Sequence, residues 1–205
     1  MAGKTTHNKT RIPKQKRSIE KKNKIMDAAM TLVAQKGIHN TNSKEIAAEA
    51  GVAIGTFYSY FPNKNQLLVE LLDIYLKDHF HRIWKDEIST DATSFQQTIR
   101  HLTQNLLDAY DVAPDFHKET HVLRYSDPEV KALYDRDTEM EIKQISHVLE
   151  QFSDYHTIKN IKAAALVIQS ASENLVHKIK FMGIKDEKPA IDEFSEMIYK
   201  YIFIK

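Results

Sequence analysis

The sequence has no cysteine and only five glycines among its 205 residues. The absence of cysteine excludes a disulfide framework and a thiolate metal site, and it is typical of a reducing compartment. The few glycines form no phosphate-binding loop, and the sequence contains neither a nucleophile motif nor a metal-ligand constellation. These absences argue against a helical enzyme, so the sequence predicts no catalytic residue and no cofactor.

Long hydrophobic runs are also missing. The first 24 residues lack the apolar core of a signal peptide, and no segment approaches the length of a membrane span. With 42% hydrophobic and 28% charged residues, the composition is that of a soluble globular protein. The sequence therefore predicts a cytoplasmic protein that does not engage a membrane.

The net charge of +1 hides an uneven distribution of charge. Residues 1–64 contain 12 Lys or Arg against 4 acidic residues, whereas residues 65–205 contain 17 against 24. A basic N-terminal quarter on an acidic body indicates an anionic partner at one end, and nucleic acid is the natural candidate. Residues 1–17 show no periodicity and are expected to form a disordered basic arm, which contacts DNA or only solubilises the chain.

Residues 41–64 have the pattern of two short helices joined by a tight turn. Asn42 and Glu45 have the spacing of a capping box, in which each side chain satisfies a backbone donor at the helix start. Gly51 stands where a helix ends in a left-handed conformation. The second helix must stop before Pro62, which cannot continue it. The pattern predicts a helix-turn-helix, with an amphipathic helix ahead of it covering its apolar side.

This stretch resembles the DNA-binding pattern of TetR-type transcriptional regulators, which reads roughly TT-x-x-x-IA-x-x-AGVS-x-GTLY-x-HF-x-x-K-x-x-L. The resemblance implies an all-α fold. It comprises an N-terminal three-helix helix-turn-helix DNA-binding domain, residues 18–64, and a C-terminal helical ligand-binding and dimerisation domain, residues 65–205. Asn42, Ala53 and Tyr60 depart from the family pattern, and they leave the base preference open. The matching residues are Thr41, Ile46, Ala47, Ala50, Gly51, Val52, Gly55, Thr56, Phe57, Tyr58, Phe61, Lys64 and Leu67.

The resemblance and the chemistry of the side chains together predict a set of DNA contacts. A threonine at a helix start lies near free backbone N–H groups, and Lys64 supplies a point charge for a phosphate. Gly55 allows the duplex to approach the helix closely. We assign Tyr58 to the DNA contacts and not to the core, because a buried hydroxyl group would need a hydrogen-bond partner. The predicted contacts are Thr41, Ser43, Ala53, Ile54, Gly55, Thr56, Tyr58, Tyr60 and Lys64.

The rest of the chain is helical by pattern, with no convincing strand. Apolar residues recur at three- and four-residue steps, and a polar break at residues 89–94 interrupts this pattern. Pro128 at an early helical position, preceded by Ser126 or Asp127 as a cap, marks one helix start. The predicted helices, beginning with the one ahead of the helix-turn-helix, cover residues 18–35, 64–84, 95–110, 115–124, 128–152, 157–182 and 190–204.

The last two helices are expected to form a self-association surface, although an ordinary core role is the alternative. Small residues in the penultimate helix allow close packing, and the apolar stripe of the last helix needs covering. TetR-type proteins dimerise through such a pair in a four-helix bundle, which implies a homodimer on a near-palindromic double-stranded DNA operator. The predicted interface residues are Ala164, Ile168, Ala171, Leu175, Ile191, Phe194, Ile198 and Tyr201.

The family resemblance also implies a small-molecule effector within the C-terminal helices. A mostly apolar pocket with a few convergent polar groups suits such a ligand, although for any one residue a surface or core position is the commoner alternative. His117 and His121 share a helix face at a spacing that suits metal ligands, but without a third ligand no metal site is predicted. The candidate effector residues are Trp84, Tyr110, Phe116, His117, His121, Arg124, Tyr134, His147, Gln169, Asn174 and His177.

The sequence-based interpretation is a sequence-specific, homodimeric DNA-binding repressor that a small-molecule ligand releases from its operator. Binding of the effector would lower the affinity for DNA, and by reciprocal linkage binding of DNA would lower the affinity for the effector. The alternatives are an activator, a regulator without a small-molecule effector, and a non-specific DNA-binding protein, which would bind with steep salt dependence and no preferred sequence.

Overall fold

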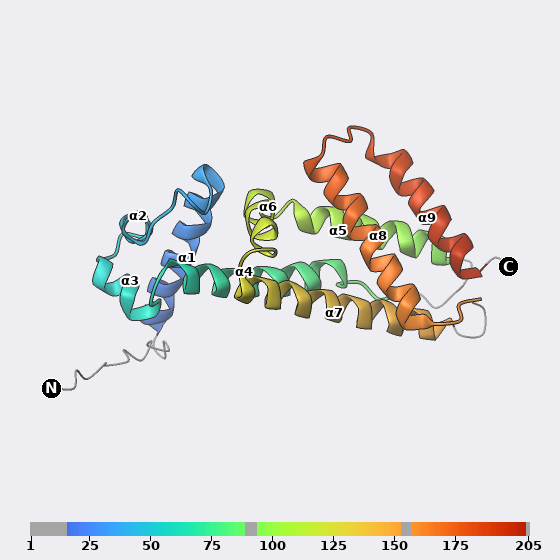
Figure 1. The fold of residues 1–205 in the computed structure, drawn as a ribbon, viewed down its shortest axis with the longest axis horizontal. Helices are drawn as coiled ribbons and strands as arrows, with labels where there is room; N and C mark the ends of the chain where they lie inside the picture. Colours follow the sequence, from blue (N-terminus) through green and yellow to red (C-terminus); the bar gives the residue numbers. More distant parts are fainter. Residues whose placement is uncertain (1–15, 89–93, 153–156, 204–205) are drawn as a thin grey trace. The chain divides into compact units, whose positions relative to one another are not determined.

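The computed structural model describes residues 16–88, 94–152 and 157–203, and these residues form nine helices (Figure 1). The predicted all-α fold is confirmed. By contacts within the chain, the residues divide into two units, Met1–Asp73 (unit 1) and Ile74–Lys205 (unit 2), so that the division falls inside α4. The helices are α1 Lys16–Lys36, α2 Ser43–Glu49, α3 Ile54–Tyr60, α4 Lys64–Ile83, α5 Phe95–Tyr110, α6 Pro114–Leu123, α7 Pro128–Gln151, α8 Ile161–Phe181 and α9 Glu187–Phe203.

Unit 1 contains α1, α2, α3 and the first part of α4, and α2 contacts both α1 and α3. The core of this unit follows from helical spacing. On α1 the buried residues recur every three or four positions, and one face of α4 does the same. Because α1 begins at Lys16, Lys16 and Arg17 belong to this helix and not to the basic arm predicted for residues 1–17. Residues 1–15 of that arm lie outside the described residues. The buried α1 residues are Ile25, Ala28, Ala29, Leu32 and Val33.

Unit 2 contains the rest of α4 and the helices α5 to α9. Helix α8 contacts α5, α7 and α9, and α5 also contacts α9 (Figure 1). Phe95 and Phe152 meet edge to face in the larger apolar cluster of unit 2, with ring centroids 4.5 Å apart. Each such fully buried aromatic stabilises the fold by about 1.5–3 kcal/mol. None of the helices in the described part of the chain combines the length and hydrophobicity that crossing a lipid bilayer requires.

Local capping chemistry determines where the later helices begin. Asp127 caps α7 by accepting two backbone N–H groups, and Pro128 occupies the first helical position, as predicted. Helix α8 begins at Ile161 and not at the predicted residue 157, because Asn160 caps it and the Thr157 N–H donates to a carbonyl of α9. Helix α9 begins at Glu187, ahead of the predicted residue 190, because a proline is tolerated in a first turn.

Gly51 and Gly55 form a natural pair for testing the turn between α2 and α3. Gly51 has φ +65°, in the left-handed region, whereas Gly55 lies within α3. Gly51→Ala should lower the free energy of unfolding by about 1–2 kcal/mol, because a Cβ disfavours that conformation. Gly55→Ala should be neutral or stabilising by about 0.5–1 kcal/mol. Denaturant midpoints at an unchanged m-value measure both effects, and equal midpoints would contradict the assignment.

Candidate functional site

Short-range hydrogen bonds determine the geometry of the helix-turn-helix. The Asn42 side-chain oxygen accepts from the backbone N–H groups of Lys44 and Glu45 at 3.0 and 3.1 Å. In return the Glu45 carboxylate accepts from the Asn42 N–H at 3.2 Å, which confirms the predicted capping box. Gly51 at φ +65° then ends α2, so that the chain reverses over a few residues and α3 starts at Ile54.

Helix α3 has one buried face and one exposed face. Phe57 is fully buried, whereas Ile54 and Tyr58, one turn apart, are 37% and 49% exposed. Gly55 is also exposed, and a Cβ placed there would meet no atom within 4 Å. Packing within unit 1 therefore does not require glycine at position 55, and the absence of a Cβ there would allow an outside partner to approach the backbone closely. The exposed face offers apolar and hydroxyl groups of the kind that contact base edges.

Three predicted DNA contacts make hydrogen bonds inside unit 1. The buried Thr41 hydroxyl donates to a backbone carbonyl one turn earlier at 2.9 Å. The Tyr60 hydroxyl lies 2.8 Å from that of Ser18 on α1. The Lys64 ammonium donates to the carbonyls of Ile38 and Thr41, both at 2.8 Å, and burial lowers its pKa. These bonds give all three residues a structural role, and their contact with DNA stays a prediction.

The remaining predicted contacts lie at or near the surface. Ser43, at the first position of α2, and Thr56, in the middle of α3, are half-buried. Ala53, the residue that precedes α3, is exposed. We call the five residues Ala53, Ile54, Gly55, Thr56 and Tyr58 the α3 surface.

Unit 2 contains a polar cavity of about 50 Å³. Its lining comes from α4, α5, α6, α7 and α8, and it includes three carboxyl groups, two imidazoles and two phenols. This volume holds a few waters or an ion, and it is well below the ~300–1,000 Å³ of pockets for drug-sized ligands. The polar lining residues are His79, Tyr110, His117, Tyr134, Asp137, Thr138, Glu141, Gln169, Ser172 and Glu173.

An apolar cavity of about 90 Å³ adjoins the polar one. The two cavities share Trp84 and four other lining residues, and the second is otherwise lined mainly by aliphatic and phenylalanine side chains. At this junction the Trp84 Nε1 atom is buried without a hydrogen-bond partner among the described residues, as is the His79 Nδ1 atom in the polar cavity. Buried polar atoms are rarely left unsatisfied, so these two atoms indicate room for a ligand or water.

The three carboxyl groups of the polar cavity are held in different protonation states. Burial raises the pKa of Glu141 to about 8, and the nearby Asp137 adds to the shift. Burial and the charge of Glu173 likewise raise the pKa of Asp137 to about 7. Burial also acts on Glu173, but the close approach of His121 and a hydrogen bond from Gln169 outweigh it and lower the pKa to about 2. The cavity therefore contains one firm negative charge and two carboxyl groups poised to titrate near neutral pH.

Histidines surround this charge. Burial lowers the pKa of His79 to about 4 and lowers the pKa of His117 and His177 as well, with neighbouring imidazoles adding to the effect on His117 and His177. These three side chains are consequently neutral near pH 7, where each ring has one unprotonated nitrogen that can accept a hydrogen bond or bind a ligand.

Residues 25–71 match the sequence profile of bacterial regulatory proteins of the tetR family. The match runs from Ile25 on α1 into the first part of α4, and so spans the helix-turn-helix and the helices that cover it. The chain belongs to the TetR family. This family consists of transcriptional regulators and is non-enzymatic, in agreement with the interpretation of the sequence.

Similar proteins extend the match along the chain. An uncharacterised HTH-type transcriptional regulator of Bacillus subtilis, YuxN, is 36% identical over 94 residues, which are 45% of this chain and 32% of YuxN. The HTH-type transcriptional repressor KstR2 of Rhodococcus jostii is 28% identical over 93 residues, 45% of each chain. The alignments thus cover about a third to under half of these two relatives.

A solved structure has the same fold over nearly the whole chain. A transcriptional regulator from Saccharomonospora viridis, determined in complex with choline, superposes with a TM-score of 0.75 at 19% identity. The superposition covers 91% of this chain and 100% of that one. At this level of identity the likeness shows that the fold is shared.

Most of the predicted effector residues of this TetR-family chain gather around the two cavities. Phe116 is buried against the Tyr75 ring and lines neither cavity. His147 and Asn174 are exposed and also lie outside both. His121, Arg124 and His177 surround Glu173, with the His121 and Arg124 nitrogens each 3.6 Å from one carboxylate oxygen. The predicted residues that line a cavity directly are Trp84, Tyr110, His117, Tyr134 and Gln169.

Most of the predicted interface residues are packed in the interior of unit 2. Ile191 packs in one of its apolar clusters and Tyr201 is 47% exposed. Four large apolar side chains of α8 and α9 are exposed, and we call them the α8–α9 patch: the predicted residue Tyr201, and Leu166, Val167 and Met197, which lie beside predicted positions. The other predicted residues pack in or against the larger cluster, namely Ala164, Ile168, Ala171, Leu175, Phe194 and Ile198.

The sequence did not single out His79, Asp137, Glu141 or Glu173 as site residues. Isolated acidic residues on helices are usually solvated, so composition offers no signal for Asp137 or Glu141. Glu173 did have one, because it lies four residues before His177 and thus on the same face of α8.

The protonation of Glu141 predicts a pH effect on stability. Its carboxyl titrates near 4.5 when unfolded and near 8 when folded, so the folded chain holds a proton that the unfolded chain has released. The free energy of unfolding should therefore fall as the pH rises through this window. Glu141→Gln should reduce this fall, to which the raised pKa of Asp137 also contributes, and should stabilise the protein at about pH 8, on the order of 1–2 kcal/mol after allowance for solvent screening. The exposed Glu139→Gln on the same helix is the control, and a parallel pH profile in all three proteins would refute the assignment.

Proposed function

We propose that this chain is a homodimeric DNA-binding transcriptional repressor that a small-molecule effector releases from its operator. The observation that carries the proposal is the α3 surface, where Ile54, Gly55 and Tyr58 are exposed on a helix whose other face is anchored in unit 1 by the buried Phe57. A recognition helix needs this combination, since it must be fixed to the domain on one side and open to the major groove on the other.

Charge supports nucleic acid as the partner of unit 1. Exposed lysines lie along the N-terminal part of α1, and Lys44 is exposed on α2. Lys22 and Lys36, by contrast, pair with acidic side chains within unit 1. Exposed cations contribute affinity for phosphates without base preference, whereas the α3 surface would supply that preference. The basic residues 1–15 would add further phosphate contacts.

The α8–α9 patch supports dimerisation through the last two helices. Its four large apolar side chains are exposed on two helices that contact each other, and apolar groups gathered in this way favour association. A second copy of the chain is the partner that we propose. Two copies related by a two-fold axis would read two half-sites of a near-palindromic operator.

The two adjoining cavities support a small-molecule effector. The polar cavity offers an anionic carboxylate, two titratable carboxyls and two buried polar atoms without a hydrogen-bond partner among the described residues, and the apolar cavity continues it. An amphipathic molecule, with a polar or cationic group beside Glu173 and an apolar part beyond Trp84, would match this lining. Because both cavities are small, binding would have to enlarge them, and that coupling could alter the DNA-binding state.

Similarity to the repressor KstR2 and to a regulator crystallised with choline supports ligand-controlled repression as the mode of action. If the ligand prefers the non-binding state by about 3 kcal/mol, operator affinity falls on the order of 100-fold. An activator, or a regulator without an effector, is the alternative. In that case filling the cavities would leave DNA affinity unchanged.

Selection of binding sites from random duplex DNA at ~0.15 M salt, near physiological ionic strength, tests the function directly. A two-fold-symmetric consensus is the expected result. Binding that rises uniformly at lower salt with no enriched sequence would instead identify a non-specific DNA-binding protein.

With the selected duplex in hand, Tyr58→Phe tests the α3 surface. Loss of one hydroxyl contact should weaken binding about 3- to 10-fold, while helical content and dimerisation stay unchanged. Tyr125→Phe, on an 82% exposed residue of unit 2, is the matched control. Equal affinities for the two variants would remove the Tyr58 hydroxyl from the interface.

Val167→Asp tests the α8–α9 patch. Val167 is 56% exposed in the monomer, so the substitution should leave the fold intact. A carboxylate buried without a partner at a dimer interface costs several kcal/mol, so the dimer should weaken by more than about 100-fold. Analytical ultracentrifugation measures this. Val122→Asp, on an exposed valine of α6, should leave the dimer unchanged, and a dimer that survives Val167→Asp places the interface elsewhere.

A further inference from the structure

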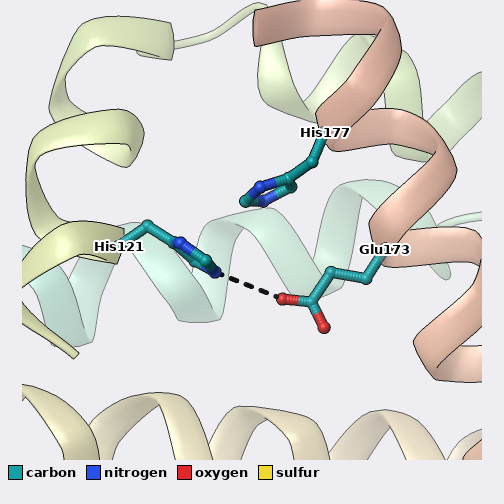
Figure 2. A group of neighbouring side chains, drawn as sticks. All are labelled: His121, Glu173 and His177. Carbon is teal, nitrogen blue, oxygen red and sulfur yellow. Dashed lines mark ion pairs between the residues drawn. The ribbon is translucent and has the colours of Figure 1, made fainter. Parts of the chain in front are cut away.

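Two pairs of potential metal ligands face each other in unit 2. His117 and His121 are four residues apart on α6, and Glu173 and His177 are four residues apart on α8. Residues at this spacing lie on one face of a helix. Figure 2 shows His121 approaching from α6 toward Glu173 and His177, which both project from α8 into the same space. Glu173 and His177 thus provide the third and fourth potential ligands that the pair His117 and His121 lacked in the sequence.

The distances within this group are those of a ligand set. One ligand atom each from His121, Glu173 and His177 lies within 4.8 Å of the other two. The His121 Nε2 atom is 3.6 Å from the Glu173 carboxylate, and the His117 Nε2 atom is 3.2 Å from that of His177. Ligand atoms around a tetrahedral zinc ion, at metal distances of 2.0–2.1 Å, are separated by about 3.3–3.4 Å. Small side-chain adjustments would therefore suffice to close the site around an ion.

The protonation states also suit a metal. Metal ligands must be unprotonated, and burial lowers the pKa of both His117 and His177. The Tyr75 hydroxyl lies 3.2 Å from the His117 Nδ1 atom. If this hydroxyl accepts a hydrogen bond from Nδ1–H, the Nε2 atom is unprotonated and the ring is oriented, which is the usual effect of outer partners on metal-bound histidines.

An ion pair between Glu173 and Arg124 is the competing explanation for the cluster. Arg124 has other partners, however, because it also lies 3.7 Å from the Asp135 carboxylate and donates to the Thr138 hydroxyl at 3.3 Å. Its guanidinium also lies 5.4 Å from the centre of the Tyr134 ring. Arg124 can keep these contacts when Glu173 binds a metal, and the ion pair does not account for the convergence of His117, His121 and His177.

We propose that His121, Glu173 and His177 bind a divalent transition-metal ion such as Zn²⁺, with His117 adjacent as the candidate fourth ligand. Two or three imidazoles and one carboxylate form a donor set suited to zinc and its neighbours in the first transition row. The proposal goes beyond DNA binding and ligand release, and metal binding can be measured without DNA. Its failure is therefore distinguishable from failure of the proposed function.

The test uses the full chain, stripped of metal with a chelator and then dialysed. Zn²⁺ binding is measured by competition with a chromophoric chelator, and Co²⁺ serves as a spectroscopic probe. We expect one ion per chain and the visible absorption of four-coordinate cobalt. Absence of saturable binding by the wild-type chain overturns the proposal.

Single substitutions locate the ion. His121→Gln, Glu173→Gln and His177→Gln should each weaken Zn²⁺ binding by more than about 100-fold, beyond the 10–100-fold typical of outer-shell partners. His147→Gln, on an exposed histidine of α7, is the matched control and should bind as the wild type does. Weakening by His117→Gln in the same range would make it the fourth ligand, while a smaller effect would leave three protein ligands and a water, and both outcomes preserve the site. Unchanged affinity in the first three variants refutes it.

A gain of signal guards against variants that only disturb the fold. The chain contains no cysteine, so His177→Cys would introduce a single thiol at the proposed site. Coordination by this thiolate should add a sulfur-to-cobalt charge-transfer band that the wild-type protein lacks. Val122→Cys, at an exposed position of α6, should show no such band. Identical spectra for the two cysteine variants would place the ion elsewhere.

Discussion

The arrangement of unit 2 depends on how the negative charge of Glu173 is neutralised. A carboxylate in a helical interior loses hydration, and it stays ionised only if cations and hydrogen-bond donors replace water. Gln169 on the same helix donates to it, and His121 and Arg124 approach it from α6 and from the residue that ends α6. Because Gln169 also donates to Glu141 on α7, this one charge connects three helices. The hydrogen bonds and ion pairs that surround Glu173 at the polar cavity answer that requirement.

A different division of roles governs unit 1. Its α3 has only seven residues, too few to be stable alone, so it depends on the buried Phe57, which anchors it in the unit. The capping box and Gly51 fix the two ends of the preceding α2. The side chains on the exposed face of the same helix, Ile54 and Tyr58, are not needed to pack the unit. Tyr60 illustrates the limit of this freedom, because its hydroxyl is engaged with Ser18 although the residue lies only two positions from the exposed Tyr58.

Much of this could be predicted from the sequence because the signals are local. Periodic apolar residues predicted every helix, and the capping box, the cap at Asp127 and the turn at Gly51 were confirmed. The starts of α8 and α9 were not predicted correctly, since α8 is delayed by a contact between Thr157 and α9 that no local pattern contains. The same limit applies to Leu166, Val167 and Met197 of the α8–α9 patch, because periodicity identifies the apolar stripe of a helix but not the apolar residues beside it.

The sequence by itself determined the helical class, the helix-turn-helix and its family, because these depend on interactions within a few residues along the chain. Only the tertiary structure decided which polar side chains meet. His121 and Glu173 are separated by fifty-two positions, and no spacing rule relates them. They converge because α6 and α8 pack in the same interior, where lost hydration forces each buried charge to find a partner. Burial also decided that Thr41 and Lys64 serve the fold of unit 1, whereas Ile54 and Tyr58 remain exposed on its surface.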